Sequence, residues 1–352
     1  MSVDEDGHAT DAATVPRGRW LVQAAGRRHT RLTLRIATVL VTVGFTYLAL
    51  HGIDLGRAWK GLRTSNYWWL LPALVAFAAG NLARALRWRA LFPSGRRPPF
   101  ATTLNAMMIG YLYNSILPAR AGEAARIVVL TQRSESPPVE ITATVLLERV
   151  YDVGAILIVF LVAQPWLPSV SWFGAATVAA GVLAAGIGVL VGVLVVFGDR
   201  PLRMLLRPVH RVAPIAEERV ERIVAELTRG LSGLHDWRVA IEALLWTFAA
   251  WLSSSLCAYL VALAFHLHIG LAGGILVMVA IGLGMILPAA PAAVGVFEGA
   301  TLIALRAYGL GRSVALPYAL VLHLVNFVPF LLVGAALLHH NSRHPPGQSR
   351  TG

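Results

Sequence analysis

Charged and helix-breaking residues inside otherwise apolar segments are the first candidates for chemistry in this sequence. A charge at the centre of a membrane helix costs about 2.5–3.5 kcal/mol on insertion, so charges found there tend to have a function. The candidate binding residues are Asn114, Arg120, Glu123, Arg126, Glu148, Arg149, Asp152, Pro288, Pro291 and Glu298. We expect no catalytic set, no metal ligands and no cofactor.

The first group of candidates surrounds a break at Pro118. Proline removes a backbone donor and clashes with the preceding turn, so one helix should end there and another begin near Gly122. The free N–H groups at the start of the second helix, with Arg120 beside them, favour an anion such as phosphate. Glu123 and Arg126, three residues apart, are expected to pair on one helical face. The alternative is a pair that merely neutralises itself near the membrane interface.

The second group is Glu148-Arg149-Val150-Tyr151-Asp152. Glu148 and Asp152 are one helical turn apart, and Arg149 reaches Asp152 three residues on. Three charges inside a membrane span must face protein or water. The pattern leaves two roles open, which are locking the preceding helices to this span and contacting a substrate.

The third group lies around Pro288 and Pro291 and ends at Glu298. Glu298 is a lone acid among small residues. It is either a titrating functional carboxylate or an acid stabilised by the dipole at a helix start. Further on, His323 and Asn326 form a polar stripe, which we expect to hold helices together.

Composition places all these residues in a membrane protein. Of the 352 residues, 57% are hydrophobic and 14% are charged, and the mean hydropathy is +0.65. Soluble domains carry about 25% charged residues, so this chain has too little polar surface to be one. The formal charge of +12 does not indicate nucleic-acid binding, because the arginines flank apolar blocks without a basic domain. Signals for an enzyme are poor, since no Walker or dinucleotide-binding glycine motif occurs.

The apolar blocks predict the layout of the chain in the membrane. They lie at 32–50, 67–92, 101–117, 121–132, 142–163, 173–197, 239–266, 271–287, 292–308 and 314–338. About 20 apolar residues cross the hydrocarbon core as a helix. The stretches 101–132 and 271–308 are interrupted by proline and small residues, so each is either a kinked span or a re-entrant hairpin.

The distribution of arginine distinguishes these two layouts. With hairpins, the loop 198–238 and its eight arginines face the cytoplasm, as the positive-inside rule requires. We therefore predict an all-α integral membrane protein with six full spans plus two re-entrant broken-helix hairpins. Both termini should be cytoplasmic, in a bacterial-type inner membrane.

This layout contains an inverted repeat, because each half of the chain has an odd number of crossings. The predicted parts are a disordered cytoplasmic N-terminus (1–31), repeat one (32–163) with hairpin 101–132, repeat two (164–338) with an amphipathic cytoplasmic loop (198–238) and hairpin 271–308, and a disordered C-terminus (339–352). The shared Ile-Leu-Pro-Ala at 116–119 and 286–289 falls at corresponding places. Paired interrupted segments in two halves indicate a transport site near the midplane.

Four motifs in order give the chain a family resemblance. They are Arg84-x₂-Arg87-Trp88-Arg89, then Gly110-x₃-Asn114-x₂-Leu117-Pro118-x-Arg120-x-Gly122-Glu123-x₂-Arg126, then Glu148-Arg149-x₂-Asp152, and finally Pro288-x₂-Pro291-x₃-Gly295-x₂-Glu298. From 32 to 338 the chain resembles the transmembrane, flippase-like domain of lysylphosphatidylglycerol synthases and its stand-alone relatives. One departure is that Ala289, Ala290, Ala292 and Ala293 stand where a Ser/Pro-Gly-Gly-rich turn is common.

The resemblance implies lipid translocation without the soluble transferase domain of the two-domain synthases. We expect a lipid or lipid-carrier translocase that handles an anionic or aminoacylated headgroup. The expected partners are membrane lipids, a phospholipid or a polyprenyl phosphate, and no nucleic acid. The alternative is an accessory membrane subunit that presents a lipid-linked substrate to a separate glycosyl- or acyltransferase. A membrane-embedded enzyme ranks third.

Overall fold

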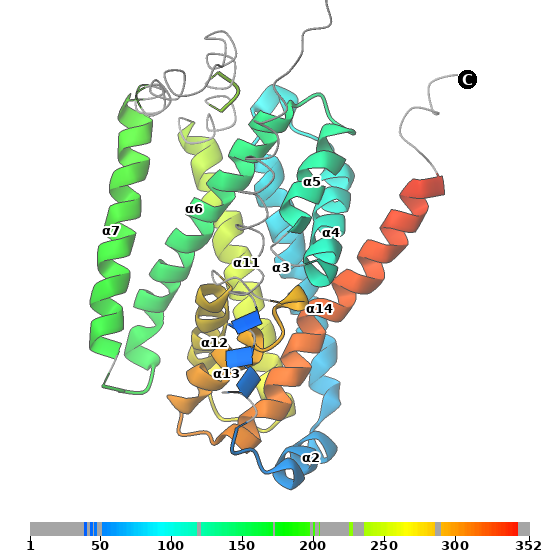
Figure 1. The fold of residues 1–352 in the computed structure, drawn as a ribbon. Helices are drawn as coiled ribbons and strands as arrows, with labels where there is room; N and C mark the ends of the chain where they lie inside the picture. Colours follow the sequence, from blue (N-terminus) through cyan, green and yellow to red (C-terminus); the bar gives the residue numbers. More distant parts are fainter. Residues whose placement is uncertain are drawn as a thin grey trace, which may run out of the picture.

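The structure is a computed structural model, and the part of the chain that it describes is helical. It describes residues 39–40, 43–44, 46–47, 51–117, 121–171, 173–197, 200, 204, 225–227, 236–285 and 290–343. The longer helices are α2 (Leu55–Thr64), α3 (Leu70–Ala90), α4 (Phe100–Ile116), α5 (Ala121–Thr131), α6 (Pro138–Ala163), α7 (Phe173–Phe197), α11 (Trp237–Ala264), α12 (Gly270–Gly284), α13 (Val296–Arg306) and α14 (Arg312–Arg343) (Figure 1). No strand occurs within the described ranges, which confirms the predicted all-α class.

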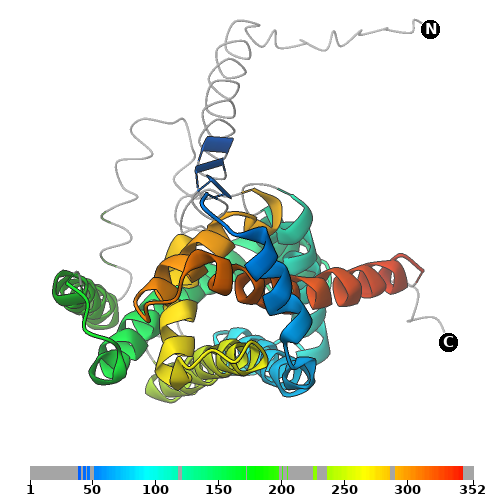
Figure 2. The same ribbon diagram turned by 90° about the horizontal axis from the view of Figure 1, so that it is seen from below.

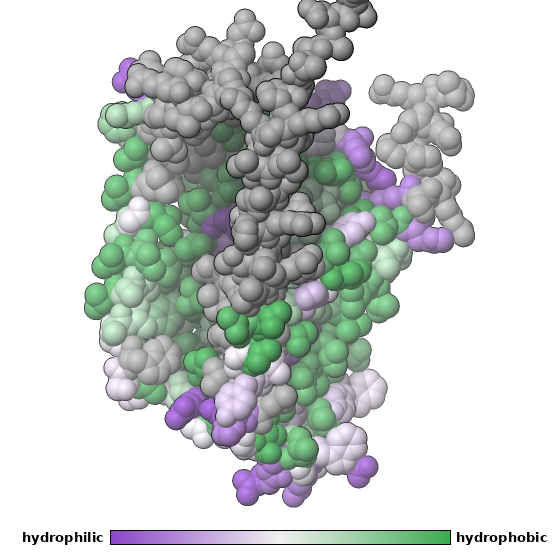
Figure 3. All heavy atoms as spheres, in the orientation of Figure 1, coloured by the Kyte–Doolittle hydropathy of each residue, from purple (hydrophilic) through white to green (hydrophobic). Residues whose placement is uncertain are grey.

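Long apolar helices make this a membrane protein. In the described ranges, three helical stretches are long and apolar enough to cross a bilayer: Tyr67–Ala90, Trp237–Ala264 and Arg312–Asn341. Apolar side chains cover much of the flank of the molecule, and polar side chains gather at its lower end (Figure 3). The first predicted span, 32–50, and the amphipathic part of loop 198–238 fall almost entirely outside the described residues. The count of six spans therefore stays a prediction.

The centre of the bundle is the packing of α3 against α11. A small residue permits their close approach, because a side chain at Gly80 would meet the carbonyl oxygen of Ala250 at 3.3 Å. Apolar residues of α6, α12 and α14 complete the core around this pair. The helix α7 packs against α6 at one side of the bundle (Figures 1 and 2), and most of its surface is exposed.

The first proline-interrupted segment folds back on itself. Helices α4 and α5 pack side by side, which the two halves of one kinked helix could not do. The side-chain oxygen of Asn114 accepts a hydrogen bond from the Gly122 N–H at 2.8 Å and so caps the second helix. Gly110 and Gly122 bring the two backbones together, since a Cβ at Gly122 would lie 1.9 Å from the Gly110 carbonyl oxygen. We call α4 and α5 hairpin 1.

The second interrupted segment folds back in the same way. Helices α12 and α13 pack against each other and are joined through the short 3₁₀ turn η5 (Pro291–Ala293). In that turn Ala292 and Ala293 both have a φ of 56°, and Gly295, with a φ of 84°, precedes α13. The alanines thus occupy left-handed conformations that glycine adopts without a steric penalty. We call α12, η5 and α13 hairpin 2.

The two hairpins meet inside the bundle, and α14 packs against both. Turn η5 of hairpin 2 contacts α4 of hairpin 1, and α14 packs on both α4 and α13. Gly334 allows the approach to α4, because a Cβ there would lie 2.6 Å from the Leu112 Cβ. Asn105 and Asn341 join their side-chain amides across the same interface.

One described helix has no counterpart among the predicted apolar segments. Helix α2 follows Asp54, whose side chain caps it through the N–H groups of Gly56 and Arg57. It lies at the lower end of the molecule beside the start of α14 (Figure 1). The Asp54 N–H donates to the Ser313 hydroxyl at 2.9 Å, which fixes the segment to α14.

Candidate functional site

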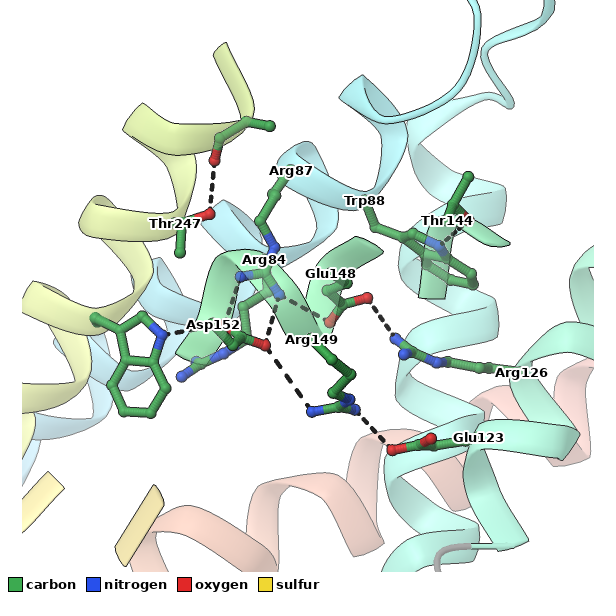
Figure 4. Close-up of polar contacts among 12 residues, drawn as sticks. Arg84, Arg87, Trp88, Glu123, Arg126, Thr144, Glu148, Arg149, Asp152 and Thr247 are labelled. Carbon is green, nitrogen blue, oxygen red and sulfur yellow. Dashed lines mark hydrogen bonds and ion pairs between the residues drawn. The ribbon is translucent and has the colours of Figure 1, made fainter. Parts of the chain in front are cut away.

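Seven charged side chains gather inside the bundle between α3, α5 and α6 (Figure 4). This arginine cluster consists of Arg84, Arg87, Glu123, Arg126, Glu148, Arg149 and Asp152. On each helix, cluster residues three or four positions apart leave the helix on one face. Five of the ten residues predicted from the sequence belong to this cluster: Glu123, Arg126, Glu148, Arg149 and Asp152.

Arg87 is the centre of the cluster. Its Nη2 lies 2.8 Å from Glu148 Oε1, and its Nη1 lies 2.5 Å from Asp152 Oδ1. The Arg87 side chain has no exposed surface, and that of Glu148 is 3% exposed. A buried guanidinium needs such partners, because leaving its charge unpaired lowers the free energy of unfolding by about 3–5 kcal/mol. Arg87 therefore ties α3 to α6.

Arg126 of α5 occupies the other oxygen of Glu148. Its Nη1 lies 3.0 Å from Glu148 Oε2, and its guanidinium carbon lies 4.8 Å from the centre of the Trp88 ring. The Trp88 indole N–H in turn donates to the Thr144 hydroxyl at 3.1 Å. Two further donors of Arg126, Nε and Nη2, are buried without a hydrogen-bond partner among the described residues. The arginine is thus only partly satisfied by the protein.

Arg149 and Glu123 form the more exposed edge of the cluster. Arg149 Nη2 lies 2.7 Å from Glu123 Oε1, and the two side chains are 43% and 29% exposed. Arg149 Nη1 also approaches Asp152 Oδ2 at 3.9 Å, as the spacing of three residues predicts. The pair connects hairpin 1 to α6.

The predicted pairing of Glu123 with Arg126 on one face of α5 is wrong. Glu123 pairs with Arg149, and Arg126 pairs with Glu148, both of them on α6. A carboxylate deep in the bundle needs a close guanidinium partner, because only their mutual attraction offsets the cost of desolvating the buried charge. The pairs therefore lock hairpin 1 to α6 instead of neutralising α5 by itself.

Arg84 completes the cluster and pairs with no carboxylate among the described residues. Its Nη2 donates to the Ser254 hydroxyl at 2.9 Å, and the guanidinium lies 6.0 Å from the Trp251 ring centre. The Trp251 indole N–H donates to Asp152 Oδ1 at 3.0 Å. The cluster thus sets four arginines against three carboxylates, which leaves one surplus positive charge.

The remaining predicted residues lie in or near the hairpin turns. Asn114 caps α5, so its contact is with the backbone of its own hairpin. Pro291 opens turn η5 of hairpin 2. Arg120 and Pro288 lie outside the described residues, so their role stays a prediction.

Glu298 is not the lone acid that the sequence indicated. Its Oε1 contacts Nδ1 of His323 on α14, and its Oε2 accepts a hydrogen bond from the Gly295 N–H at 2.7 Å. The His323 ring packs against the Phe297 and Phe327 rings at centroid distances of 4.7 and 4.4 Å, and these two rings also contact each other at 5.8 Å. Asn326 donates to the Leu322 carbonyl of its own helix at 2.8 Å. Of the predicted polar stripe on α14, His323 therefore makes the contact between helices.

The motifs that carry this site are those of a known protein family. Residues 35–334 match the family described as the lysylphosphatidylglycerol synthase TM region. The chain belongs to this family. The match confirms the resemblance inferred from the four motifs and supports a membrane role connected with lipids. No curated protein matches the chain.

Two residues of the cluster, Arg84 and Arg87, were not predicted as site residues of this TM-region protein, although the sequence contains a signal for them. Arg84 and Arg87 belong to the first of the four motifs, but they stand near the end of an apolar helix. Arginines at such an end fit the positive-inside rule, which favours a place at the cytoplasmic surface over a binding role. The signal that distinguishes them is their spacing of three residues, which places both on the face that meets α6 and α11.

Proposed function

We propose that this lysylphosphatidylglycerol synthase TM-region protein is a lipid translocase whose arginine cluster binds an anionic headgroup. The observation that carries the proposal is the surplus positive charge of the cluster inside a bundle of apolar helices. An uncompensated buried charge is costly, so a site of this kind favours a ligand of opposite charge. Most of the cost is avoided when a phosphate supplies the missing acceptors.

The individual arginines support the same ligand. Two buried nitrogen atoms of Arg126, Nε and Nη2, have no hydrogen-bond partner among the described residues, and Arg84 has a neutral partner. Guanidinium groups bind phosphate oxygens through paired, planar N–H donors. The carboxylates of the cluster, by contrast, are already held by Arg87, Arg126 and Arg149. They hold the arginines in position, while Arg84 and Arg126 are available to the headgroup.

The proposed path uses the predicted topology. Six spans and two re-entrant hairpins would place the tips of hairpin 1 and hairpin 2 near the midplane, entering from opposite sides. The headgroup would pass along the polar residues between them, with Arg120 at the tip of hairpin 1, while the acyl or prenyl chains stay in the lipid. The same topology would have both termini in the cytoplasm of a bacterial-type cell.

The test is lipid movement in vesicles that contain the purified protein. Three head-labelled lipids serve as probes: an anionic phospholipid, a zwitterionic phospholipid and a polyprenyl phosphate. We expect protein-dependent movement of an anionic lipid that is lost in Arg84→Gln and in Arg120→Ala at an unchanged yield of folded protein. Arg84→Gln should fold, because the Ser254 hydroxyl keeps its bond to the Ala250 carbonyl. The matched control is Arg63→Gln on α2, since Arg63 stacks on Trp59 outside the cluster.

Two results would contradict the proposal in different ways. Full movement in Arg84→Gln would show that the arginine cluster does not bind the headgroup. No protein-dependent movement of any of the three lipids would make the accessory subunit of a separate transferase the better hypothesis.

A further inference from the structure

Each hairpin presents a glutamate at the third residue of its second helix. In hairpin 1 this is Glu123 of α5, which begins at Ala121, and in hairpin 2 it is Glu298 of α13, which begins at Val296. Both glutamates pair with a base on the next long helix. Glu123 pairs with Arg149 of α6, and Glu298 pairs with His323 of α14.

The spacing along the chain is almost the same in both pairs. Arg149 follows Glu123 by 26 residues, and His323 follows Glu298 by 25. The two pairs thus occupy corresponding positions in the two halves predicted from the sequence. In each half, the pair fixes the returning helix of the hairpin to the long helix that comes after it.

The two bases differ in whether they can release a proton. Arginine stays charged in proteins, so the Glu123–Arg149 pair is permanent. Histidine loses its proton within the physiological range, and a histidine next to a carboxylate titrates together with it. The Glu298–His323 pair therefore makes the same contact as the pair in hairpin 1, but with a base that can release its proton.

The surroundings of Glu298 and His323 make their charge state matter. Both residues are buried, and the His323 ring packs against two phenylalanine rings. Helix α12 carries no ionisable side chain, and α4 offers Tyr111 and Tyr113. Helix α13 itself carries Arg306 in its last turn, and α14 carries Arg312, Tyr318, His339, His340 and Arg343. Three further helices pack against α14. Their ionisable residues are Arg238, Glu242, Cys257 and Tyr259 on α11, Arg57, Lys60 and Arg63 on α2, and Arg84, Arg87 and Arg89 on α3. Among the described residues, the Glu298 carboxylate contacts the His323 ring, the Gly295 N–H and its own backbone N–H.

We propose that Glu298 and His323 form a proton-binding site that controls the position of hairpin 2. This inference rests on the proposed translocase function and adds a coupling ion to it. With the proton bound, the pair is neutral overall and holds α13 against α14. Without it, a net negative charge remains in apolar surroundings, which is costly, and the Gly295 N–H together with the helix dipole recovers only part of that cost. Hairpin 2 then shifts toward water, while hairpin 1 keeps its permanent pair.

The experiment follows the mobility of both hairpin tips as the pH changes. A nitroxide label is attached at Val294→Cys, next to turn η5, and in a second protein at Leu117→Cys, at the end of α4. Both positions are exposed. The native Cys257 is replaced by alanine so that each protein carries one thiol. Spectra are recorded in vesicles between about pH 5 and pH 9, the range that includes the titration of histidine.

We expect the mobile component at position 294 to grow as the pH rises, through one transition of a single proton. No such transition is expected at position 117. His323→Arg copies the permanent base of hairpin 1 and should abolish the transition, as should Glu298→Gln. The second variant keeps the test decisive if arginine does not fit beside the two phenylalanine rings.

Three outcomes would overturn the inference: no pH dependence at position 294, the same dependence at position 117, or an unchanged transition in Glu298→Gln. The measurement needs no lipid substrate and no transport. A negative result here would therefore contradict the proton site and not the proposed translocation. A negative result in the vesicle assay would contradict translocation and not the proton site.

Discussion

Glu148 Oε1 of α6 lies 2.8 Å from Arg87 Nη2 of α3, and Glu148 Oε2 lies 3.0 Å from Arg126 Nη1 of α5. One carboxylate thus joins three helices inside the bundle. Because it pairs with two buried guanidinium groups, it supports the fold as well as any bound headgroup. The expectation that these charges lock hairpin 1 to the following helix and the expectation that they contact a substrate are therefore compatible.

Replacing Glu148 should destabilise the protein strongly. In Glu148→Gln, Arg126 loses the one ion pair that it makes among the described residues, and Arg87 keeps its pair with Asp152. Removing one member of a buried ion pair costs about 3–5 kcal/mol of unfolding free energy. The matched control is Glu123→Gln at the exposed edge, where we expect a loss of about 1 kcal/mol or less. Thermal unfolding in detergent measures both, and equal losses would show that the central and edge pairs are equivalent.

A methyl group on Gly122 should prevent hairpin 1 from closing. Its Cβ would lie 1.9 Å from the Gly110 carbonyl oxygen and 2.6 Å from Asn114 Oδ1. Because two backbones would have to separate, we expect Gly122→Ala to cost at least about 3 kcal/mol, the upper end for overpacking. Gly154→Ala on α6 has no neighbour within 4 Å. That control should gain about 0.5–1 kcal/mol from helix propensity. A fully stable Gly122→Ala protein would contradict the tight contact.

Replacing Ala292 with glycine should stabilise hairpin 2. Ala292 has a φ of 56°, a left-handed conformation that costs an L-residue roughly 1–2 kcal/mol and glycine much less. We expect Ala292→Gly to raise the free energy of unfolding by about 1 kcal/mol. The control is Ala307→Gly, where φ is −60° and glycine brings only its entropic cost. A loss of stability in Ala292→Gly would show that the left-handed turn is wrong.

Trp251 should hold Asp152 in place through its indole N–H. Trp251→Phe keeps an aromatic ring but removes the donor at 3.0 Å from Asp152 Oδ1. A hydrogen bond to a charged group contributes about 1.5–3 kcal/mol, so we expect a loss of that size. Trp59→Phe on the exposed face of α2 should change the unfolding free energy little. Chemical denaturation of the two variants side by side distinguishes the lost donor from a general effect of losing a tryptophan.

The exposed face of α7 should be in contact with lipid. Val182 lies near the middle of this helix and is 67% exposed. A carboxylate there would cost about 2.5–3.5 kcal/mol on insertion, whereas a substitution at a water-exposed surface usually stays within about 0.5 kcal/mol. Val182→Asp should therefore lower the fraction of protein that resists carbonate extraction, and Val182→Leu should not. Unchanged insertion of Val182→Asp would show that water or protein covers this face.

The interruption of each hairpin was predictable from local sequence, whereas the choice of a hairpin over a kinked span required the arginine distribution along the chain. Proline at 118 and at 288 and 291 interrupts apolar segments, and the described helices end or begin beside these positions. Proline acts on its own turn and on the residue before it, so its effect does not depend on distant parts of the chain. The cap of α5 by Asn114 and the close approach of Gly122 to Gly110 required the folded hairpin, because they join residues eight or more positions apart.

By itself, the sequence determined the class of the protein, the approximate bounds of its apolar helices and its family. These properties follow from composition, runs of apolar residues and motif order, all of which are local or summed along the chain. Only the tertiary structure decided which charges meet: Glu123 with Arg149, Arg87 with Glu148 and Asp152, and Glu298 with His323. The physical reason is that a buried charge chooses its partner by the rotation and crossing of packed helices. Neighbours along one helix cannot reveal that geometry.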